Sequence, residues 1–494
     1  MSARRAYLAL SLALMLFGAV QATNDPWNGD FWEHAAVIRE LAAHPLHPAH
    51  PLLDLAAPHP LFTPYHLALA LIVRATGIAP YRLLGMAGVL ILGLVALAIW
   101  LFARWWARSV AAAPFLLAFS LLLWGHEPWR WSGFLHVGII GRTAAYPSIL
   151  GLALAILALA FAARYLETGL ARFATATGAL AGAVILIHPF STGVLWAGTA
   201  ALIWRALRDA PRRGFAVAGA VALGTLAATA WPYYSLLGLI RESGSAYDAQ
   251  QRPVYERFVE RTLPILFAVP LFVQRLRRDH RDPTALAGSG LSVLIAFGFV
   301  SGRYSIGRTL PGTIFMAHTA LADWTANRAV PWLVAAFGRS RLRAASLSAG
   351  VLVLASAIAV NFAETWPLCV PGHAHPLAPY AFLARNVGAQ EVVLADLKTS
   401  AMVPVVAGRV VAVNNALPFV ADAGARREDV TAFFETGTSD EERDRILTRY
   451  HVRWVLLNHS GQTGESALEP WLRARGRAIY EDSRFILIDV GEVS

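Results

Sequence analysis

Long apolar runs separated by short polar segments dominate the first three quarters of the chain. Several of these runs approach the ~17–25 residues that an α-helix needs to cross a lipid bilayer. We therefore expect a polytopic α-helical membrane protein with about 11 transmembrane helices. The expected runs are 6–22, 83–103, 109–124, 147–163, 173–187, 190–204, 215–236, 262–274, 284–300, 312–338 and 345–362.

Charge decides how the shorter apolar run 61–77 should be interpreted, since Pro64, His66 and Arg74 interrupt it. If this run does not span, the segments on the cytoplasmic side hold 17 arginines in 41 residues, and the opposite loops hold 11 in 120. If it spans, this bias is inverted, against the excess of basic residues in cytoplasmic loops. We therefore expect 61–77 to form a helix along the membrane surface, with the N-terminus cytoplasmic and the C-terminus external.

Composition supports a membrane protein, because 56% of the residues are hydrophobic and only 15% are charged. Soluble domains usually carry about a quarter charged residues. The single cysteine, Cys369, excludes an intrachain disulfide and a multi-cysteine metal site. One alternative remains for residues 1–22, which also fit a cleavable signal peptide. The segment that follows is external under either interpretation.

The pattern changes near residue 373, where short β-branched runs begin to alternate with helical ones. The expected strands are "EVVLAD", "GRVVAV", "RWVLLN", "RAIYED" and "RFILIDV", and the expected helices are "REDVTAFFE", "SDEERDRILTRY" and "GESALEPWLRARG". We expect a transmembrane domain over 1–372, with a first external loop at 23–82, and an external α/β domain over 373–494. The α/β domain lacks the G-x-G-x-x-G spacing of a dinucleotide site.

The first external loop begins with three acids, Asp25, Asp30 and Glu33. "GDFWEHAAVIREL" has helical periodicity, which places His34 one turn after Asp30. A carboxylate at a membrane surface can act as a general base. The alternative is structural, because Asp30 and Glu33 also match the N-cap and N3 positions of a capping box.

Three histidines, His44, His47 and His50, each precede a proline in "HPLHPAHP". Proline favours polyproline II geometry, which repeats every three residues and would align the three side chains on one face, roughly 9 Å apart. Zinc ligands lie ~2 Å from the metal, so consecutive histidines on a straight segment cannot chelate one ion. A bend, or help from His59 and His66, could still build a site. We interpret the segment mainly as a semi-rigid surface connection.

Taken together, these features resemble the GT-C superfamily of polytopic membrane glycosyltransferases. The resemblance rests on "NDPWNGDFWEHAAVIREL" and "HPLFTPYHLALALIVRATGI" after the first apolar run, on the pattern Asp30, His34, Pro64 and His66, and on the external α/β domain. It implies two juxtamembrane helices in the first external loop and an essential acid near its start. It also implies a polyprenyl-phosphate-linked sugar donor, an extracytoplasmic glycan or protein acceptor, and the bacterial inner membrane as location.

The chain departs from this family by lacking a D-x-D motif, an adjacent Asp-Glu pair in the loop and a W-W-D motif. The resemblance therefore leaves the sugar, the acceptor and a divalent metal open. Membrane lipids and the lipid-linked donor are the expected partners, and nucleic acid is not. Two rivals stay open: a flippase or transporter for lipid-linked sugars, and a non-catalytic envelope assembly protein that binds a partner through its α/β domain.

Within this resemblance, Asp30 is the first choice for the catalytic base, followed by Asp25 and Glu33, with His34 orienting Asp30 or sharing its proton. Arginine suits phosphate recognition, and the glycine-flanked pair in "GFVSGRYSIGRTLPG" predicts a donor-phosphate site. Snorkelling to lipid head groups and the interfacial aromatic belt are the alternatives for these cations and tryptophans. The expected phosphate ligands are Arg303, Arg308 and Arg142, and the expected substrate-cleft residues are His66, Trp129, Trp131, His188 and Tyr304.

Overall fold

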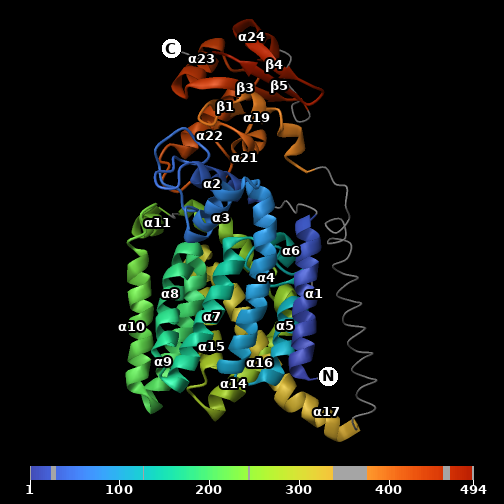
Figure 1. The fold of residues 1–494 in the computed structure, drawn as a ribbon, viewed down its shortest axis with the longest axis vertical. Helices are drawn as coiled ribbons and strands as arrows, with labels where there is room; N and C mark the ends of the chain where they lie inside the picture. Colours follow the sequence, from blue (N-terminus) through green and yellow to red (C-terminus); the bar gives the residue numbers. More distant parts are fainter. Residues whose placement is uncertain are drawn as a thin grey trace. The chain divides into compact units, whose positions relative to one another are not determined.

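The computed structural model describes residues 2–23, 29–125, 127–242, 245–337, 375–459 and 468–491 (Figure 1). The chain divides into two compact units. The helical unit comprises Met1–Pro26, Gly85–Trp231 and Ser243–His373, and the loop–sheet unit comprises Trp27–Leu84, Pro232–Glu242 and Ala374–Ser494. The first external loop thus belongs to the same unit as the C-terminal α/β segment.

Helices occupy ten of the eleven expected apolar runs, and the run 345–362 lies outside the described residues. The longer helices are α1 Ala3–Thr23, α4 Pro80–Trp105, α5 Ala113–Leu122, α7 Pro147–Thr168, α8 Ala171–Ile187, α9 Pro189–Asp209, α10 Pro211–Ala228, α14 Ala268–Arg278, α15 Pro283–Val300 and α16 Leu310–Trp324. Shorter pieces connect them: η1 Val110–Ala112, α6 Val137–Thr143, α12 Ser245–Gln251, η2 Arg252–Tyr255, α13 Phe258–Thr262, η3 Leu263–Phe267, η4 Tyr304–Thr309, the π-helix η5 Thr325–Ala329 and α17 Val330–Phe337.

Four of the described helices, α1, α4, α7 and α15, are both long and apolar enough to cross a membrane. The shorter apolar helices include α8 and the segment made by η1 and α5. A multi-pass membrane protein is therefore supported, and the number of about eleven spans stays a prediction.

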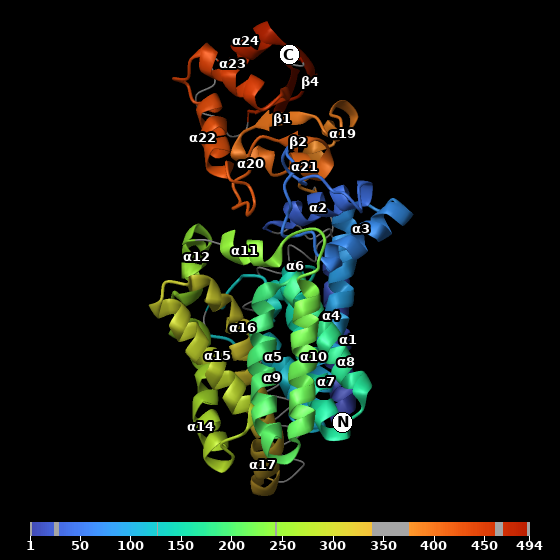
Figure 2. The same ribbon diagram turned by 90° about the vertical axis from the view of Figure 1, so that its left-hand side faces the viewer.

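Proline and glycine explain how the helical unit is built. Proline stands in the first turn of α7, α9, α10 and α15, where its missing N–H group is not needed. Helices α7, α8, α9 and α10 pack side by side (Figures 1 and 2). At the α8–α10 contact a Cβ atom added to Gly224 would lie 1.9 Å from the carbonyl oxygen of Gly178. Only glycine permits such close approach, as is common between membrane helices.

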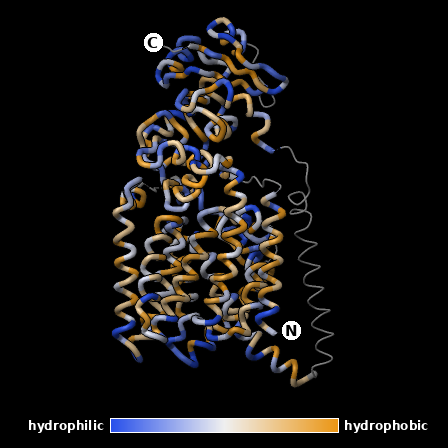
Figure 3. Tube along the Cα trace, viewed as in Figure 1, coloured by the Kyte–Doolittle hydropathy of each residue, from blue (hydrophilic) through white to orange (hydrophobic). Residues whose placement is uncertain are grey.

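Hydrophilic residues gather at one end of the helical unit, at the lower end in Figure 3. The start of α1, the α9–α10 connection and the α14–α15 connection all lie there (Figures 1 and 3). These are three of the arginine-rich segments on which the topology prediction rests. The fold therefore places them at a common end, as the excess of basic residues requires.

The loop–sheet unit begins with two helices, α2 Phe31–Ala43 and α3 Pro64–Thr76, which pack against each other. Helix α3 starts at a proline, its first turn is capped by the Thr63 hydroxyl, and it ends at the left-handed Gly77. With 13 residues, α3 is shorter than a bilayer-spanning helix. The remaining helices are α11 Leu236–Glu242, η6 Ala378–Tyr380, α19 Leu383–Asn386, α20 Leu397–Ser400, α21 Val403–Val406, α22 Ala423–Phe434, α23 Asp440–Arg449 and α24 Leu468–Arg475.

A five-stranded sheet forms the centre of the C-terminal α/β segment. Each of the five predicted strands is present: β1 Val392–Ala395, β2 Arg409–Val410, β3 Val452–Asn458, β4 Arg477–Glu481 and β5 Phe485–Asp489. The strand order is β2-β1-β3-β5-β4; β1 is parallel to β2 and β3, whereas β5 is antiparallel to β3 and β4. Aliphatic residues of β1, β3 and β5 pack with Phe433 of α22 and Ile446 of α23 to form the core.

The expected single face of histidines in "HPLHPAHP" is wrong. His44 and His47 are exposed, but His50 is fully buried. The chain turns inward there because the backbone N–H groups of Leu52 and Leu53 donate to Nδ1 of His50, at 3.3 and 3.1 Å. A turn that satisfies two buried backbone donors outweighs the local preference of proline for an extended segment.

Candidate functional site

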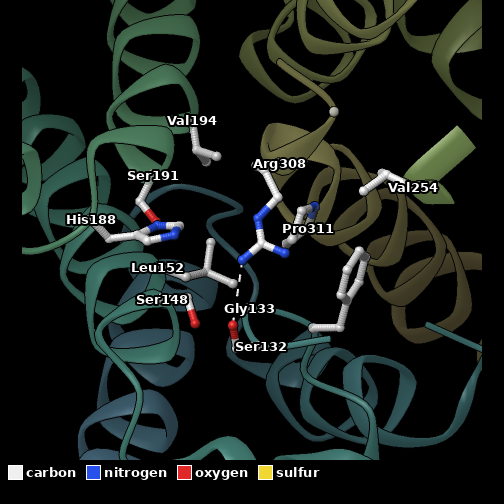
Figure 4. A pocket seen from close by; sticks show the side chains of 12 residues that line it. Ser132, Gly133, Ser148, Leu152, His188, Ser191, Val194, Val254, Arg308 and Pro311 are labelled. Atoms are coloured by element: carbon white, nitrogen blue, oxygen red, sulfur yellow. Dashed lines mark hydrogen bonds between the residues drawn. The ribbon is translucent and has the colours of Figure 1, made fainter. Parts of the chain in front are cut away.

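A polar pocket lies within the helical unit at the junction of several connections (Figure 4). Its polar side chains come from the segment before α6, from the first turns of α7 and α9, and from η4. The lining residues are Ser132, Gly133, Phe134, Ser148, Leu152, His188, Ser191, Val194, Val254, Gly307, Arg308 and Pro311.

Arg308 supplies the positive charge of this pocket. Its guanidinium points toward Ser132, whose hydroxyl lies 3.4 Å from Nη2 (Figure 4). The guanidinium carbon also lies 5.6 Å from the ring centroid of Trp131. On the other side, Nδ1 of His188 lies 2.8 Å from the Ser191 hydroxyl. No carboxylate of the described residues forms an ion pair with Arg308. A half-buried arginine among hydroxyls is suited to binding an anion.

Arg303 occupies a different environment from Arg308. Its side chain is 64% exposed, and its Nη1 atom lies 3.4 Å from a carboxylate oxygen of Asp248, which is buried. The same carboxylate accepts the backbone N–H of Ser305 at 2.9 Å. Arg303 therefore helps to hold η4, which carries Arg308, and the two arginines are not equivalent.

The other residues predicted for the helical unit are not among the lining residues of this pocket. Arg142 is in the last turn of α6, and neither it nor Tyr304 lines the described pocket. Trp129 is fully buried, donates its indole N–H to the Val254 carbonyl at 3.0 Å and stacks on Phe134. In this structure Trp129 thus has no ring face open to a sugar.

The acids of the first loop belong to the loop–sheet unit, at the start of α2. Asp30 is exposed at the N-cap position, yet its side chain makes no capping hydrogen bond. Glu33 is buried; its Oε2 atom accepts a hydrogen bond from Asn415 at 2.7 Å, and its Oε1 atom lies 3.3 Å from Nε2 of His59. The capping-box alternative is therefore wrong, because neither carboxylate serves as a cap. Asp25 lies outside the described residues.

His34 and His66 form a buried pair, with Nδ1 of His34 2.8 Å from Nε2 of His66. Their rings stack at 5.1 Å, and Thr63 lies 2.9 Å from the second nitrogen of His66. The resemblance grouped these two histidines by motif only, and the α2–α3 packing brings them into contact. His34 is thereby oriented toward α3.

Burial sets the protonation of this histidine–carboxylate cluster. It raises the pKa of Glu33 to about 7, and the negative charge of Asp30 adds to the effect. Burial lowers the pKa of His59 to about 3 and that of His66 well below its usual range. At neutral pH the imidazoles of His59 and His66 are therefore neutral, and the Glu33 carboxyl group is close to its titration point.

The side chains of Glu33, His34, His59 and His66 are not arranged as a metal site. Among the residues that the structure describes, no group of three or more His, Cys, Asp or Glu side chains is placed to hold a metal ion. The involvement of a divalent metal therefore stays a prediction.

The pH dependence of stability tests the ionisation of Glu33. If folding raises the pKa of an acid, its contribution to stability is complete below the pKa of the unfolded chain. That contribution is lost as the pH rises to the pKa of the folded protein. The pKa of Glu33 is 4.5 in the unfolded chain and about 7 in the folded protein, so the free energy of unfolding should fall by roughly 3 kcal/mol between pH 4.5 and 7. We expect Glu33→Gln to gain stability relative to the wild type across this window. Melting curves of both proteins from pH 4.5 to 8 measure the difference, and parallel curves would contradict the assignment.

Sequence reasoning missed two residues that the site uses. Asn415 lies 382 residues from Glu33, and nothing in its local pattern points to a contact. Arg409, an arginine inside the expected strand "GRVVAV", pairs with Glu40 in the protein interior. The position of Arg409 inside a β-branched run was the only signal for this contact. Such a run predicts a buried strand, and a buried charge normally needs a partner of opposite charge.

Comparisons with known proteins give a match in fold. No protein-family model and no curated protein matches the sequence. Among solved structures, the chain is similar to the apo oligosaccharyltransferase of Archaeoglobus fulgidus, at 13% identity and a TM-score of 0.53, covering 99% of this chain and 74% of that one. It is also similar to ArnT of Cupriavidus metallidurans in the apo state, at 14% identity and a TM-score of 0.57, covering 99% of both chains.

A second structure of ArnT from Cupriavidus metallidurans, bound to undecaprenyl phosphate, is similar at 13% identity and a TM-score of 0.55. It covers 99% of this chain and 98% of that one. The likeness includes both the helical and the α/β parts of the chain. The expected fold of GT-C membrane glycosyltransferases is thus confirmed.

Proposed function

We propose that this protein is a membrane glycosyltransferase that moves a sugar from a polyprenyl-phosphate-linked donor to an extracytoplasmic acceptor. The observation that carries the proposal is the likeness of fold, which extends over 99% of the chain to an oligosaccharyltransferase and to ArnT. One of the similar ArnT structures holds undecaprenyl phosphate, a lipid of the proposed donor class.

The proposed reaction needs a base and a site for the leaving phosphate. The oxygen of an acceptor hydroxyl forms a bond to the anomeric carbon of the sugar while the bond from that carbon to the phosphate oxygen breaks. Polyprenyl phosphate leaves with the electron pair, and the hydroxyl proton passes to a carboxylate. Asp30 is the first choice for this base because its side chain is exposed and makes no capping hydrogen bond. Asp25 and Glu33 follow it, and His34 contacts His66 rather than standing alone.

Arg308 is the first choice for the donor phosphate. It lies half-buried in the pocket with the hydroxyls of Ser132, Ser148 and Ser191 among its lining. A guanidinium and several hydroxyls offer charge-assisted and neutral donors to phosphate oxygens. Arg303 is a weaker candidate because Asp248 already neutralises part of its charge.

The assay for this function measures release of polyprenyl phosphate by the purified protein from a panel of polyprenyl-phospho-sugars. Arg308→Gln is expected to raise KM for the donor roughly 10- to 100-fold, because a hydrogen bond to a charged group contributes about 1.5–3 kcal/mol. Arg303→Gln should raise it less. Arg208→Gln is the matched control, since the Arg208 side chain is 69% exposed at the end of α9.

One result would contradict the proposed transferase function, and a second would contradict the phosphate assignment alone. The first is movement of the intact donor across a vesicle membrane without cleavage of its sugar–phosphate bond, which the flippase hypothesis predicts. The second is an Arg308→Gln protein whose donor KM equals that of Arg208→Gln. That result leaves the transferase hypothesis standing and removes Arg308 from the phosphate site.

A further inference from the structure

The first external loop and the C-terminal α/β segment are joined by backbone pairing. The N–H group of Val410 in β2 donates to the Leu52 carbonyl at 2.8 Å, and Leu53 forms a parallel bridge with Val410. The loop thereby adds a short pairing at the β2 edge of the sheet. This pairing ties the segment between α2 and α3 to the β2 edge of the sheet.

A buried ion pair strengthens this junction. Arg409 of β2 and Glu40 of α2 are 1% and 3% exposed, and they bond to each other. Arg409 also donates to the Pro51 carbonyl at 3.0 Å, and the free oxygen of Glu40 accepts the Ala49 N–H at 2.9 Å. A buried pair is stable when its remaining donors and acceptors are satisfied, as they are here. Helix α2 is therefore held against the sheet along its second half.

The first half of α2 is held by Asn415, which lies five residues beyond the end of β2. Its side-chain amide donates to Oε2 of Glu33 at 2.7 Å. The backbone carbonyl of Asn415 in turn accepts a hydrogen bond from Arg427 of α22, at 3.4 Å. The backbone of Asn415 is thus held by α22, and its side-chain amide faces the acid-bearing turn of α2.

We propose that Asn415 is a positioning residue that holds the Glu33 carboxylate and, through it, the charge environment of Asp30. The α/β segment then takes part in sugar transfer by setting the ionisation of Glu33, instead of serving as a platform for a separate partner. This inference rests on the proposed glycosyltransferase function. It assigns Asn415 no contact with substrate.

The groups that face Glu33 determine what loss of the amide does. Asp30 and His34 come from α2, and His59 comes from the segment before α3. Among these neighbours, Asn415 donates a hydrogen bond that favours the ionised carboxylate. Asp30 places a negative charge near Glu33, which raises the pKa of Glu33 further. Removing the Asn415 donor therefore disfavours the ionised Glu33 carboxylate and moves the titration of Glu33 to higher pH.

The test compares pH–rate profiles of the full-length protein, with a polyprenyl-phospho-sugar from the panel as substrate. For Asn415→Leu we expect the limb of the kcat profile that follows Glu33 ionisation to move up by roughly 0.5–1 pH unit, since one hydrogen bond contributes about 0.5–1.5 kcal/mol. At pH 7, which is close to the pKa of Glu33, kcat should fall roughly 2- to 5-fold with the donor KM unchanged. Asn415→Asp should move the limb further, because it places a second negative charge beside Glu33. Asn414→Leu is the matched control, as Asn414 is the exposed neighbour.

A double-mutant cycle of thermal stability provides a readout that needs no turnover. Asn415→Leu and Glu33→Gln should be non-additive, whereas Asn414→Leu and Glu33→Gln should be additive. Additivity of the first pair would overturn the contact. Wild-type turnover with an unshifted profile in Asn415→Leu would overturn the positioning role alone. Absence of turnover by the wild type on any donor would overturn the proposed function, and this role with it.

Discussion

Asp30→Asn is expected to lower kcat roughly 10²- to 10⁴-fold, the range that general-base catalysis contributes. Asparagine has nearly the same shape as aspartate but cannot accept the acceptor proton at neutral pH. Since the Asp30 side chain makes no capping hydrogen bond, the substitution should leave the melting temperature almost unchanged. Rates measured at saturating donor and acceptor separate this chemical effect from weakened binding.

Two comparisons make this result specific. Asp54→Asn alters an exposed acid of the same loop and should keep wild-type activity. Asp25→Asn tests the second candidate in the same assay. If both Asp30→Asn and Asp25→Asn retain wild-type turnover, the assignment of the base to this loop segment fails.

Arg409→Met is expected to destabilise the loop–sheet unit by about 3–5 kcal/mol, because it leaves the buried Glu40 carboxylate without its partner. The double variant Glu40→Leu with Arg409→Met should recover most of that loss, since no unpaired charge remains in the interior. The measurement is the shift in the denaturation midpoint of the full-length protein, followed by a signal from the loop–sheet unit.

A surface pair provides the reference for this effect. Arg164 and Glu167 are 32% and 51% exposed and bond at 2.6 Å within α7. Breaking this pair with Arg164→Met should cost at most about 1 kcal/mol, because solvent screens exposed charges. Equal losses from Arg409→Met and Arg164→Met would show that the Glu40–Arg409 pair is not buried in solution.

Local pattern was sufficient for most secondary structure in the described residues. Helices occupy the expected apolar runs, and all five expected strands occur. Both kinds of element are predicted by the spacing of apolar residues that are close together in the sequence. At α3 the start of the helix is also marked by neighbouring residues, since Thr63 is the N-cap and Pro64 begins the first turn. The proline-rich segment was the exception. There the chain forms a turn around the buried His50 ring instead of the extended geometry that proline favours locally. This turn forms only when His50 is buried.

For the candidate site, local sequence pattern left more open than it decided. From sequence, Asp30 and Glu33 matched a helix cap as well as a catalytic pair, and Arg303 and Arg308 seemed equivalent. Burial of Glu33 beside His59, and the pairing of Arg303 with Asp248, separate these alternatives. Each distinction depends on the environment of a charge, which neighbouring residues alone do not specify.

The sequence by itself therefore determined that this is a membrane protein, where its apolar helices lie, and which strands follow residue 373. It also identified a loop rich in acids and histidines. Only the tertiary structure decided that Asn415 meets Glu33 and that Arg409 meets Glu40, across 382 and 369 residues. Periodicity acts over one or two helical turns, whereas these pairs exist because folding removes distant polar groups from water together and each must then find a partner.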